Sequence, residues 1–299
     1  MIAATGGFAS ESGDGGSRRL RAVLASDRAE LLASLPALQR LRPRAVHRAR
    51  VLARRMRAML RVYARAFDRT RARRARRALR ELARSLESCR EADVREALFV
   101  DLASAHRAGP RASAELDARL ARGRVEARRE AARRLESESA GPALRDALRR
   151  LEVLDELPVD WLLARLGRRA RVLEQRVDRA RGERGLHRLR LAVKSLRYAL
   201  APLVDLAPVA GQRLQQRLRV AQQRLGEQRD ASLALAWLET EPRLRRALGR
   251  RIRRELAIRE HAARRAARHA AKKIGPAWRQ WLAEAAVVTA APSDRRGRA

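Results

Sequence analysis

The chain has 299 residues, enough for one large domain or two of ordinary size, and its apolar content of 46% excludes a disordered basic tail. Good helix formers abound whereas aromatic residues make up only 3%, so the composition predicts an all-α fold. Lys and Arg total 70 against 34 acidic residues, and the formal net charge of +36 favours nucleic acid, anionic lipid or another polyanion as partner.

Apolar periodicity, interrupted by Pro and Gly, predicts helices along most of the chain. Asp27 is expected to cap the first helix, and Pro43 to begin the second. Further along, Asp93 and Asp230 are expected at helix N-termini and Gly226 at a helix C-terminus. The predicted helices span about residues 27–41, 43–63, 70–86, 93–106, 113–139, 143–156, 159–181, 185–206, 210–227, 230–240 and 243–273.

The pair Gly141-Pro142 is the clearest break near the middle of the chain. We expect one helical domain over residues 17–285, divided at this break, with Gly- and Ser-rich or basic tails at either end. The expected division is a flexible tail over 1–16, a first half over about 17–140, a second half over about 141–285 and a flexible tail over 286–299.

Cysteine usage and the N-terminal sequence bear on the compartment. Cys89 is the only cysteine, so an intrachain disulfide is impossible and a reducing compartment is expected. No apolar run approaches the roughly 18–20 residues of a membrane span, and the N-terminus lacks the basic-then-apolar order of a signal peptide. We therefore expect a cytoplasmic protein without a membrane partner.

Two stretches, 140 residues apart, carry the same row of one histidine and three cations. Steps of 3, 4 and 3 residues keep each row within a sector of about 80° on a helix. Like charges at this spacing repel by about 0.2–0.5 kcal/mol per pair, so a fold that aligns them twice is predicted to hold a polyanion there. The rows are His47, Arg50, Arg54 and Arg57 in the first half and His187, Arg190, Lys194 and Arg197 in the second.

The repeat continues beyond these rows. Leu79-Arg80 in the first half corresponds to Leu218-Arg219 in the second, at an offset of 139 residues that a loop can absorb. Two halves with the same order of motifs predict a tandem, pseudo-symmetric pair of helical bundles, because each amphipathic helix must bury its apolar face against others. Arg80 and Arg219 are expected to close a basic groove from the partner helices.

The residues around both rows resemble the CHAD family, the conserved histidine α-helical domain. The second half is the closer match, with L-H-R-L-R-L-A-V-K-S-L-R-Y from Leu186 and L-R-V-A-Q-Q-R-L-G-E-Q-R-D from Leu218. In the first half, R-E-A-D-V from Arg90 stands where the family has Arg-Asp-x-Asp-Val. The resemblance covers roughly residues 20–275 and implies two four-helix bundles around a basic channel that binds inorganic polyphosphate.

The chemistry of polyphosphate agrees with these rows. Its chain has about one negative charge per phosphate and no bases to stack or read, so it favours rows of Arg and Lys over aromatic side chains. We expect phosphate contacts from Arg50, Arg54, Arg57, Arg190, Lys194 and Arg197, with Arg80 and Arg219 closing the groove and His47 and His187 as further binding residues.

For each feature a simpler interpretation exists. One basic row alone is as well explained by a solvated helix face, and His47 or His187 by a neutral side chain packed between helices. No carboxylate lies three or four residues after either histidine to activate it as a nucleophile. The sequence also lacks a metal-binding spacing of His and Glu, so we expect no metal, no cofactor and no catalytic residue.

The main rival function is nucleic-acid binding, as in a nucleoid protein. It shares the net charge but predicts cations spread over outward helix faces. No helix-turn-helix or zinc-finger motif is present, and the low aromatic content disfavours single-strand stacking. The family's domain can be joined to a CYTH-type phosphohydrolase or synthase module. About 40 residues before the first row are too few for that β-barrel, so we expect a stand-alone protein that targets polyphosphate granules or sequesters the polymer.

Overall fold

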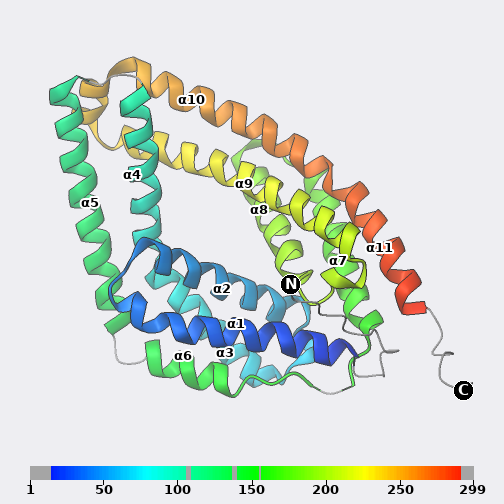
Figure 1. Cartoon of the computed structure of the whole chain (residues 1–299). Helices are drawn as coiled ribbons and strands as arrows, with labels where there is room; N and C mark the ends of the chain where they lie inside the picture. Colours follow the sequence, from blue (N-terminus) through cyan, green and yellow to red (C-terminus); the bar gives the residue numbers. More distant parts are fainter. Residues whose placement is uncertain (1–14, 106–108, 137–139, 155, 291–299) are drawn as a thin grey trace, which may run out of the picture.

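The computed structural model describes residues 15–105, 109–136, 140–154 and 156–290, and within these ranges the chain forms helices and no strand (Figure 1). The predicted all-α fold is confirmed. No helix in these ranges has the length and hydropathy needed to cross a membrane. The helices are α1 (Gly15–Gln39), α2 (Pro43–Val62), α3 (Arg69–Ser85), α4 (Glu87–Ala105), α5 (Pro110–Glu136), α6 (Ala140–Arg149), α7 (Val159–Asp178), α8 (Gly182–Ala199), α9 (Pro208–Glu239), α10 (Pro242–Lys272) and α11 (Ile274–Ala290), with 3-10 turns at Ala64–Ala66 and Val204–Leu206.

The helices form two groups that meet through α2 and α8. In the first group α2 packs against α1 and α3, and α6 lies against α3. In the second group α8 packs against α7 and α9, and α9 also contacts α10 and α11. The α4–α5 hairpin leaves the first group and reaches the far ends of α9 and α10, so the helices form a ring in Figure 1. The two groups correspond to the pair of bundles that the repeat predicted.

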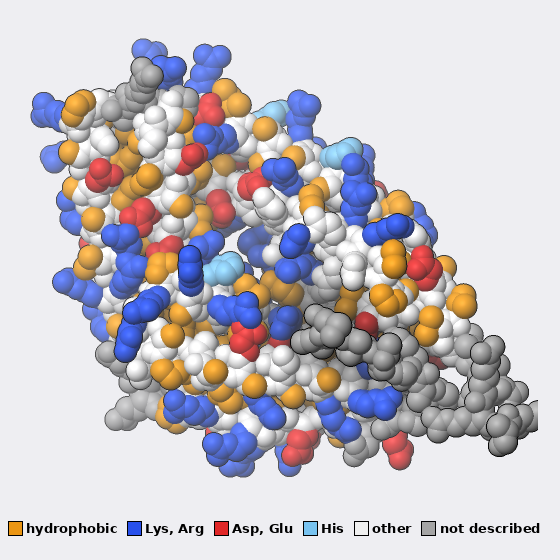
Figure 2. All heavy atoms as spheres, viewed as in Figure 1, with side chains coloured by type: hydrophobic (Ala, Val, Ile, Leu, Met, Phe, Trp, Pro, Cys, Tyr) orange, Lys and Arg blue, Asp and Glu red, His pale blue; other side chains and the backbone are white. Residues whose placement is uncertain are grey.

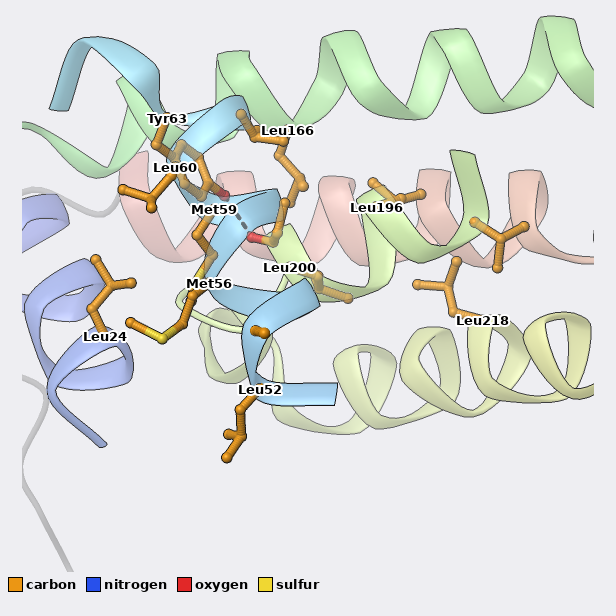
Figure 3. Close-up of a cluster of buried hydrophobic side chains, with 14 of the residues drawn as sticks. Leu24, Leu52, Met56, Met59, Leu60, Tyr63, Leu166, Leu196, Leu200 and Leu218 are labelled. Atoms are coloured by element: carbon orange, nitrogen blue, oxygen red, sulfur yellow. Dashed lines mark hydrogen bonds between the residues drawn. The ribbon is translucent and has the colours of Figure 1, made fainter. Parts of the chain in front are cut away.

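The larger core joins the two groups, because α2 and α8 both bury their apolar faces in it. Leu, Ala, Val and Met at three- and four-residue spacing give each helix one continuous apolar stripe. Figure 3 shows Met56 and Leu60 of α2 in the same cluster as Leu196 and Leu200 of the second half. The stripes are Val46, Ala49, Ala53, Met56 and Leu60 on α2 and Leu186, Leu189, Val193 and Leu196 on α8.

A hydrogen bond inside this core links the two halves directly. Tyr63 is fully buried, and its hydroxyl donates to the backbone carbonyl of Ala199 at 2.6 Å (Figure 3). Ala199 is the last residue of α8, so its carbonyl is one of those that a helix cannot satisfy internally. The Tyr63 hydroxyl therefore satisfies a buried helix-end acceptor across the boundary between the halves.

A smaller core closes the ring where α4 and α5 meet α9 and α10. Phe99 of α4 lies edge-on to Trp237 of α9, with ring centroids 5.0 Å apart. Arg119 of α5 donates to Glu241 at 2.6 Å, so an ion pair flanks the apolar contact. The buried members of this cluster are Phe99, Leu102, Leu116, Leu120, Ala234, Leu238, Leu244, Leu248, Ile252 and Leu256.

The α4–α5 hairpin also covers the single thiol. Cys89 of α4 is buried, and its Sγ lies 3.3 Å from the carbonyl oxygen of Ala127 on α5. Burial raises the pKa of the Cys89 thiol. The thiol is therefore protonated and shielded while the two helices stay in contact.

The first helix begins well before the predicted cap. α1 starts at Gly15, inside the expected tail, and Asp27 lies buried in its middle. The Asp27 carboxylate accepts a hydrogen bond from Arg55 Nε at 2.6 Å instead of capping a helix. The prediction was wrong because Leu20 and Leu24 extend the apolar stripe upstream into the larger core.

Three other predicted helix ends were wrong. α9 runs unbroken over Pro208–Glu239, so Gly226 does not end a helix and Asp230 does not cap one. Both residues line the pocket described below. Asp93 lies inside α4 and faces Arg128 of α5 at 3.5 Å, so it serves a contact between helices.

The Gly141-Pro142 pair lies at the beginning of α6. Gly141 and Pro142 fall in the first turn of α6, a position that Pro tolerates because its missing N–H is not needed there. Residues 150–154 and 156–158 then lead to α7, and the Leu154 amide donates to the Ala66 carbonyl at 2.9 Å.

The bounds of α8 and the end of the last helix also differ from the expectation. α8 begins at Gly182, whose φ is 61°, and ends at Ala199, short of residue 206. α11 continues the helical chain to Ala290, inside the expected C-terminal tail. The remaining residues of the two expected tails, 1–14 and 291–299, lie outside the described residues.

We predict that Tyr63→Phe lowers the free energy of unfolding by about 1–3 kcal/mol, because the Ala199 carbonyl would stay buried without a donor. Urea denaturation followed by circular dichroism measures the change. Tyr198→Phe is the matched control, since the Tyr198 hydroxyl makes no hydrogen bond within the described chain. Equal losses in the two variants would contradict the role given to the Tyr63 hydrogen bond.

Candidate anion-binding pocket

A pocket of about 850 Å³ lies inside the ring, between α2, α3, α4, α8 and α9. Figure 2 shows this face of the molecule hollowed at its centre, with Lys, Arg and His side chains around the hollow. Twelve cationic side chains line it against three acidic ones, Glu87, Glu91 and Asp230. The cations are Arg50, Arg54, Arg57, Arg61, Arg76, Arg80, Arg84, Arg90, Arg95, Arg190, Lys194 and Arg229.

The two predicted rows meet in this pocket because of how α2 and α8 pack. Each helix buries its apolar stripe in the larger core, which turns the cationic side of both helices towards the pocket. The rows come close enough to interact: burial lowers the pKa of both Arg190 and Lys194 on α8, and the charge of Arg54 on α2 lowers it further. Repulsion across the pocket is therefore part of the folded state.

Of the predicted site residues, all but two line the pocket. Arg197 instead points to the neighbouring helix, where its Nη1 donates to Gln222 Oε1 at 3.1 Å and its guanidinium lies 5.4 Å from the Tyr198 ring centre. Arg219 is exposed on α9, one turn before Gln222, and is not among the lining residues. The residues brought together are His47, Arg50, Arg54, Arg57, Arg80, His187, Arg190 and Lys194.

Most pocket cations form no ion pair within the described chain. Arg54, Arg57, Arg190 and Lys194 form no ion pair there, and the buried Nε of Arg190 has no hydrogen-bond partner. Elsewhere on the surface, by contrast, many arginines are paired with carboxylates, as in Arg71–Glu152, Arg119–Glu241, Arg124–Glu96 and Arg279–Glu174. The pocket thus concentrates donors that lack acceptors.

Two pocket cations are partly held by the protein itself. Arg50 is buried and its Nη1 donates to the Ala83 carbonyl, while its Nη2 lies 3.5 Å from Glu87. Arg229 donates to Glu183 at 2.6 Å. These contacts fix side chains at the floor and rim of the pocket and leave the middle of the two rows unpaired.

Burial and mutual repulsion shift the pKa values of the pocket groups. Burial lowers the pKa of Lys194 to about 7, and the charges of Arg190 and Arg54 contribute in the same direction. Burial also lowers the pKa of Arg50 to about 10. For Asp230 burial outweighs the neighbouring cations and raises the pKa of the carboxyl. The pocket therefore disfavours further positive charge as long as no anion is bound.

The two histidines lie at exposed positions on the pocket lining. Partial desolvation by the pocket wall lowers the pKa of both although their side chains reach solvent, and neighbouring arginines, Arg90 first for His47 and Arg190 first for His187, lower it further. Both imidazoles are therefore mainly neutral at pH 7. Within the described residues no carboxylate hydrogen-bonds to either ring, and no three His, Cys, Asp or Glu side chains gather as a metal site.

Sequence reasoning missed several lining cations on the same helices. Arg61 follows Arg57 by four residues and extends the first row by a turn. Arg76 and Arg84 flank Arg80 at the same spacing on α3. Their four-residue spacing from the predicted arginines could have identified them. The second half has no cations at the corresponding positions, so the internal repeat does not indicate these residues.

The comparisons with known proteins bear on this arrangement. The sequence model of the CHAD domain matches residues 22–239. Two solved structures share the fold. PptA from Streptomyces chartreusis is 22% identical with a TM-score of 0.68, and the match covers 90% of this chain and 100% of PptA. The CHAD domain from the plant Ricinus communis is 20% identical with a TM-score of 0.67, and the match covers 90% of this chain and 97% of that domain. No curated protein matches the sequence significantly.

We predict that Lys194→Met raises the melting temperature of the ligand-free protein. A lysine whose pKa falls to about 7 on folding binds protons more tightly in the unfolded chain, so it destabilises the fold most below pH 7 and progressively less up to pH 10.5. The gain should therefore be larger at pH 6 than at pH 9 in thermal melts at low salt. Lys273→Met, which removes an exposed lysine, is the control and is expected to change the melting temperature little. A gain that is equal at both pH values would contradict this account.

Proposed function

The chain belongs to the CHAD domain family, and from this premise we propose that it binds inorganic polyphosphate in the pocket and catalyses no reaction. The observation that carries the proposal is the excess of twelve lining cations over three acidic groups, with the middle of both rows unpaired. A bound polyanion would supply the missing acceptors and remove the repulsion between α2 and α8. Polyphosphate binding is also what the family resemblance implies.

The shape and chemistry of the pocket support a bare phosphate chain over a nucleic acid. Among the described residues Tyr198 is the only Phe, Tyr or Trp on the lining, and it is buried, so the pocket lacks the large exposed aromatic side chains that stack successive bases of a single strand. A volume of about 850 Å³ suits a short run of phosphates and does not enclose a duplex. Arg side chains from several helices can reach a thin chain from all sides.

A binding role also fits the state of the histidines. A nucleophilic histidine needs a base or carboxylate that orients it, and in the described chain no carboxylate hydrogen-bonds to His47 or His187. On this proposal they act as further donors when protonated. The protein would then accumulate wherever the polymer does, including cytoplasmic polyphosphate granules.

We predict that replacing Arg54, Arg57, Arg190 and Lys194 together by Gln weakens binding of long-chain polyphosphate by about 100-fold or more at about 150 mM salt. The slope of log affinity against log salt should fall by about 3, since four phosphate contacts are lost. Fluorescence anisotropy with labelled polyphosphate measures both quantities, and circular dichroism checks that helicity is unchanged.

The matched control replaces four scattered exposed arginines, Arg122 and Arg129 on α5 and Arg168 and Arg171 on α7, by Gln. It removes about the same charge without touching the pocket. If the control variant loses as much affinity as the pocket variant, binding is general electrostatics and the proposed site is wrong.

Binding is further predicted to take up protons and to tighten as pH falls from about 8 to about 6, because a bound anion raises the lowered pKa values of Lys194, His47 and His187. Calorimetry near pH 7.5, in two buffers of different ionisation enthalpy, gives the number of protons. Lys194→Arg keeps the cation but does not titrate in this range, so it should reduce the uptake. Affinity that stays constant between pH 6 and 8 would refute this prediction.

A further inference from the structure

A second row of cations lies on α10, outside residues 22–239 that match the family. At about 100° per residue its side chains fall within a sector of about 60°, and at about 1.5 Å per residue the row is about 44 Å long. All of its members are exposed, and none of them lines the pocket. The α10 row consists of Arg243, Arg250, Arg254, His261, Arg265 and Lys272.

The acidic residues of α10 do not neutralise this row. Glu255 and Glu260 lie to its sides and pair with Arg259 and Arg264, each four residues further along the helix. Within the described chain no carboxylate forms an ion pair with the cations of the α10 row. The helix therefore aligns unpaired like charges over almost its full length, which costs helix stability unless a partner is bound.

The α10 row faces outward from the ring. The opposite side of α10 buries Leu244, Leu248, Ile252 and Leu256 in the smaller core. Figure 1 places α10 along the outer edge of the molecule, and Figure 2 shows Lys, Arg and His side chains along that edge. The row thus lies on an open, convex surface, in contrast to the enclosed pocket.

A lipid surface does not fit this face. Ile258 is the only large apolar residue exposed on α10 among its described side chains, and a helix that lies in a membrane interface needs a continuous apolar face for insertion. The apolar face of α10 is already used in the ring. The partner of the row is therefore recognised by charge alone.

We propose that the α10 row binds the phosphate backbone of duplex DNA, as a second site that is separate from the pocket. A duplex carries about one charge per 1.7 Å of axis on a rod that stays straight over about 150 base pairs, so its phosphates are ordered before binding. A flexible polyphosphate chain would have to lose conformational freedom along an open face that has no walls. The straight, exposed geometry favours the rigid polyanion.

The composition of α10 favours contacts to phosphate over recognition of bases. The helix contains no Asn or Gln, the side chains that read adenine in the major groove. Its Arg and Lys side chains suit phosphate oxygens, which carry no sequence information. On this proposal the row contacts phosphates only, so binding is independent of DNA sequence and does not depend on what the pocket holds.

The test uses the full chain with Arg250, Arg254, Arg265 and Lys272 replaced by Gln. Anisotropy with a labelled duplex of about 24 base pairs, longer than the row, is expected to show an affinity loss of about 10-fold or more and a salt slope that falls by about 3–4. Affinity for polyphosphate should stay near that of the unaltered protein. The pocket variant, with Arg54, Arg57, Arg190 and Lys194 replaced, should show the reverse pattern.

Three results would overturn this second site. The first is a row variant that keeps its affinity for the duplex. The second is a scattered control, at Arg122, Arg129, Arg168 and Arg171, that loses as much duplex affinity as the row variant does. If the row variant loses polyphosphate affinity instead of duplex affinity, the row belongs to polyphosphate and the assignment to DNA is wrong. If the pocket variant keeps its affinity for polyphosphate, only the proposed function is contradicted, because that variant leaves the α10 row intact.

Discussion

Repulsion between α2 and α8 is the constraint on which the rest of the structure depends. The two helices place Arg54 opposite Arg190 and Lys194, close enough to lower the pKa values of both. What holds them there is apolar burial on their other sides, in the larger core, at roughly 25 cal/mol per Å² of buried apolar surface. The hydrogen bond from Tyr63 to Ala199 adds a directional contact at the same boundary. A fold that is stable despite an unpaired cationic interior can keep that interior ready for an anion.

The sequence was sufficient to predict the all-α fold and most of the pocket lining, for a definite physical reason. A row at steps of 3, 4 and 3 stays on one side of a helix wherever that helix packs, and its duplication placed it in both halves. The position of a helix end depends on tertiary contacts, so Asp27, Asp93 and Asp230 resembled caps although each faces a neighbouring helix or the pocket.

For two residues, spacing along the helix did not predict correctly whether the side chain lines the pocket. Arg197 belongs to the α8 row by angle, but Gln222 on α9 accepts a hydrogen bond from it. Arg219 has the right place in the repeat but lies one turn before the lining of the pocket. Neither outcome is contained in the sequence of α8 or α9 taken separately, because both depend on the axial offset between the two helices.

The ring itself is held at two places of different character. The larger core joins the groups through α2 and α8, whereas the smaller core joins α4 and α5 to α9 and α10 with fewer apolar side chains. Ion pairs such as Arg119–Glu241 and Arg259–Asp101 supplement the smaller one. The exposed Arg259–Asp101 pair contributes about 0–1 kcal/mol and is weakened by salt, whereas Arg119–Glu241 is partly buried. Because it also has fewer apolar side chains, we expect the smaller core to be the side of the ring that opens more readily.

The buried thiol of Cys89 can report on opening of the ring through its rate of chemical modification. Cys89 is the single cysteine of the chain and lies under α5, on the hairpin that closes the ring. A thiol reagent reaches it only when the surrounding helices open, for example when α5 separates from α4, so the rate of modification under native conditions reports the free energy of that opening. Any ligand that ties α4 to its neighbours will lengthen the lifetime of the unmodified thiol, and the motion of the ring can be timed without adding a label elsewhere.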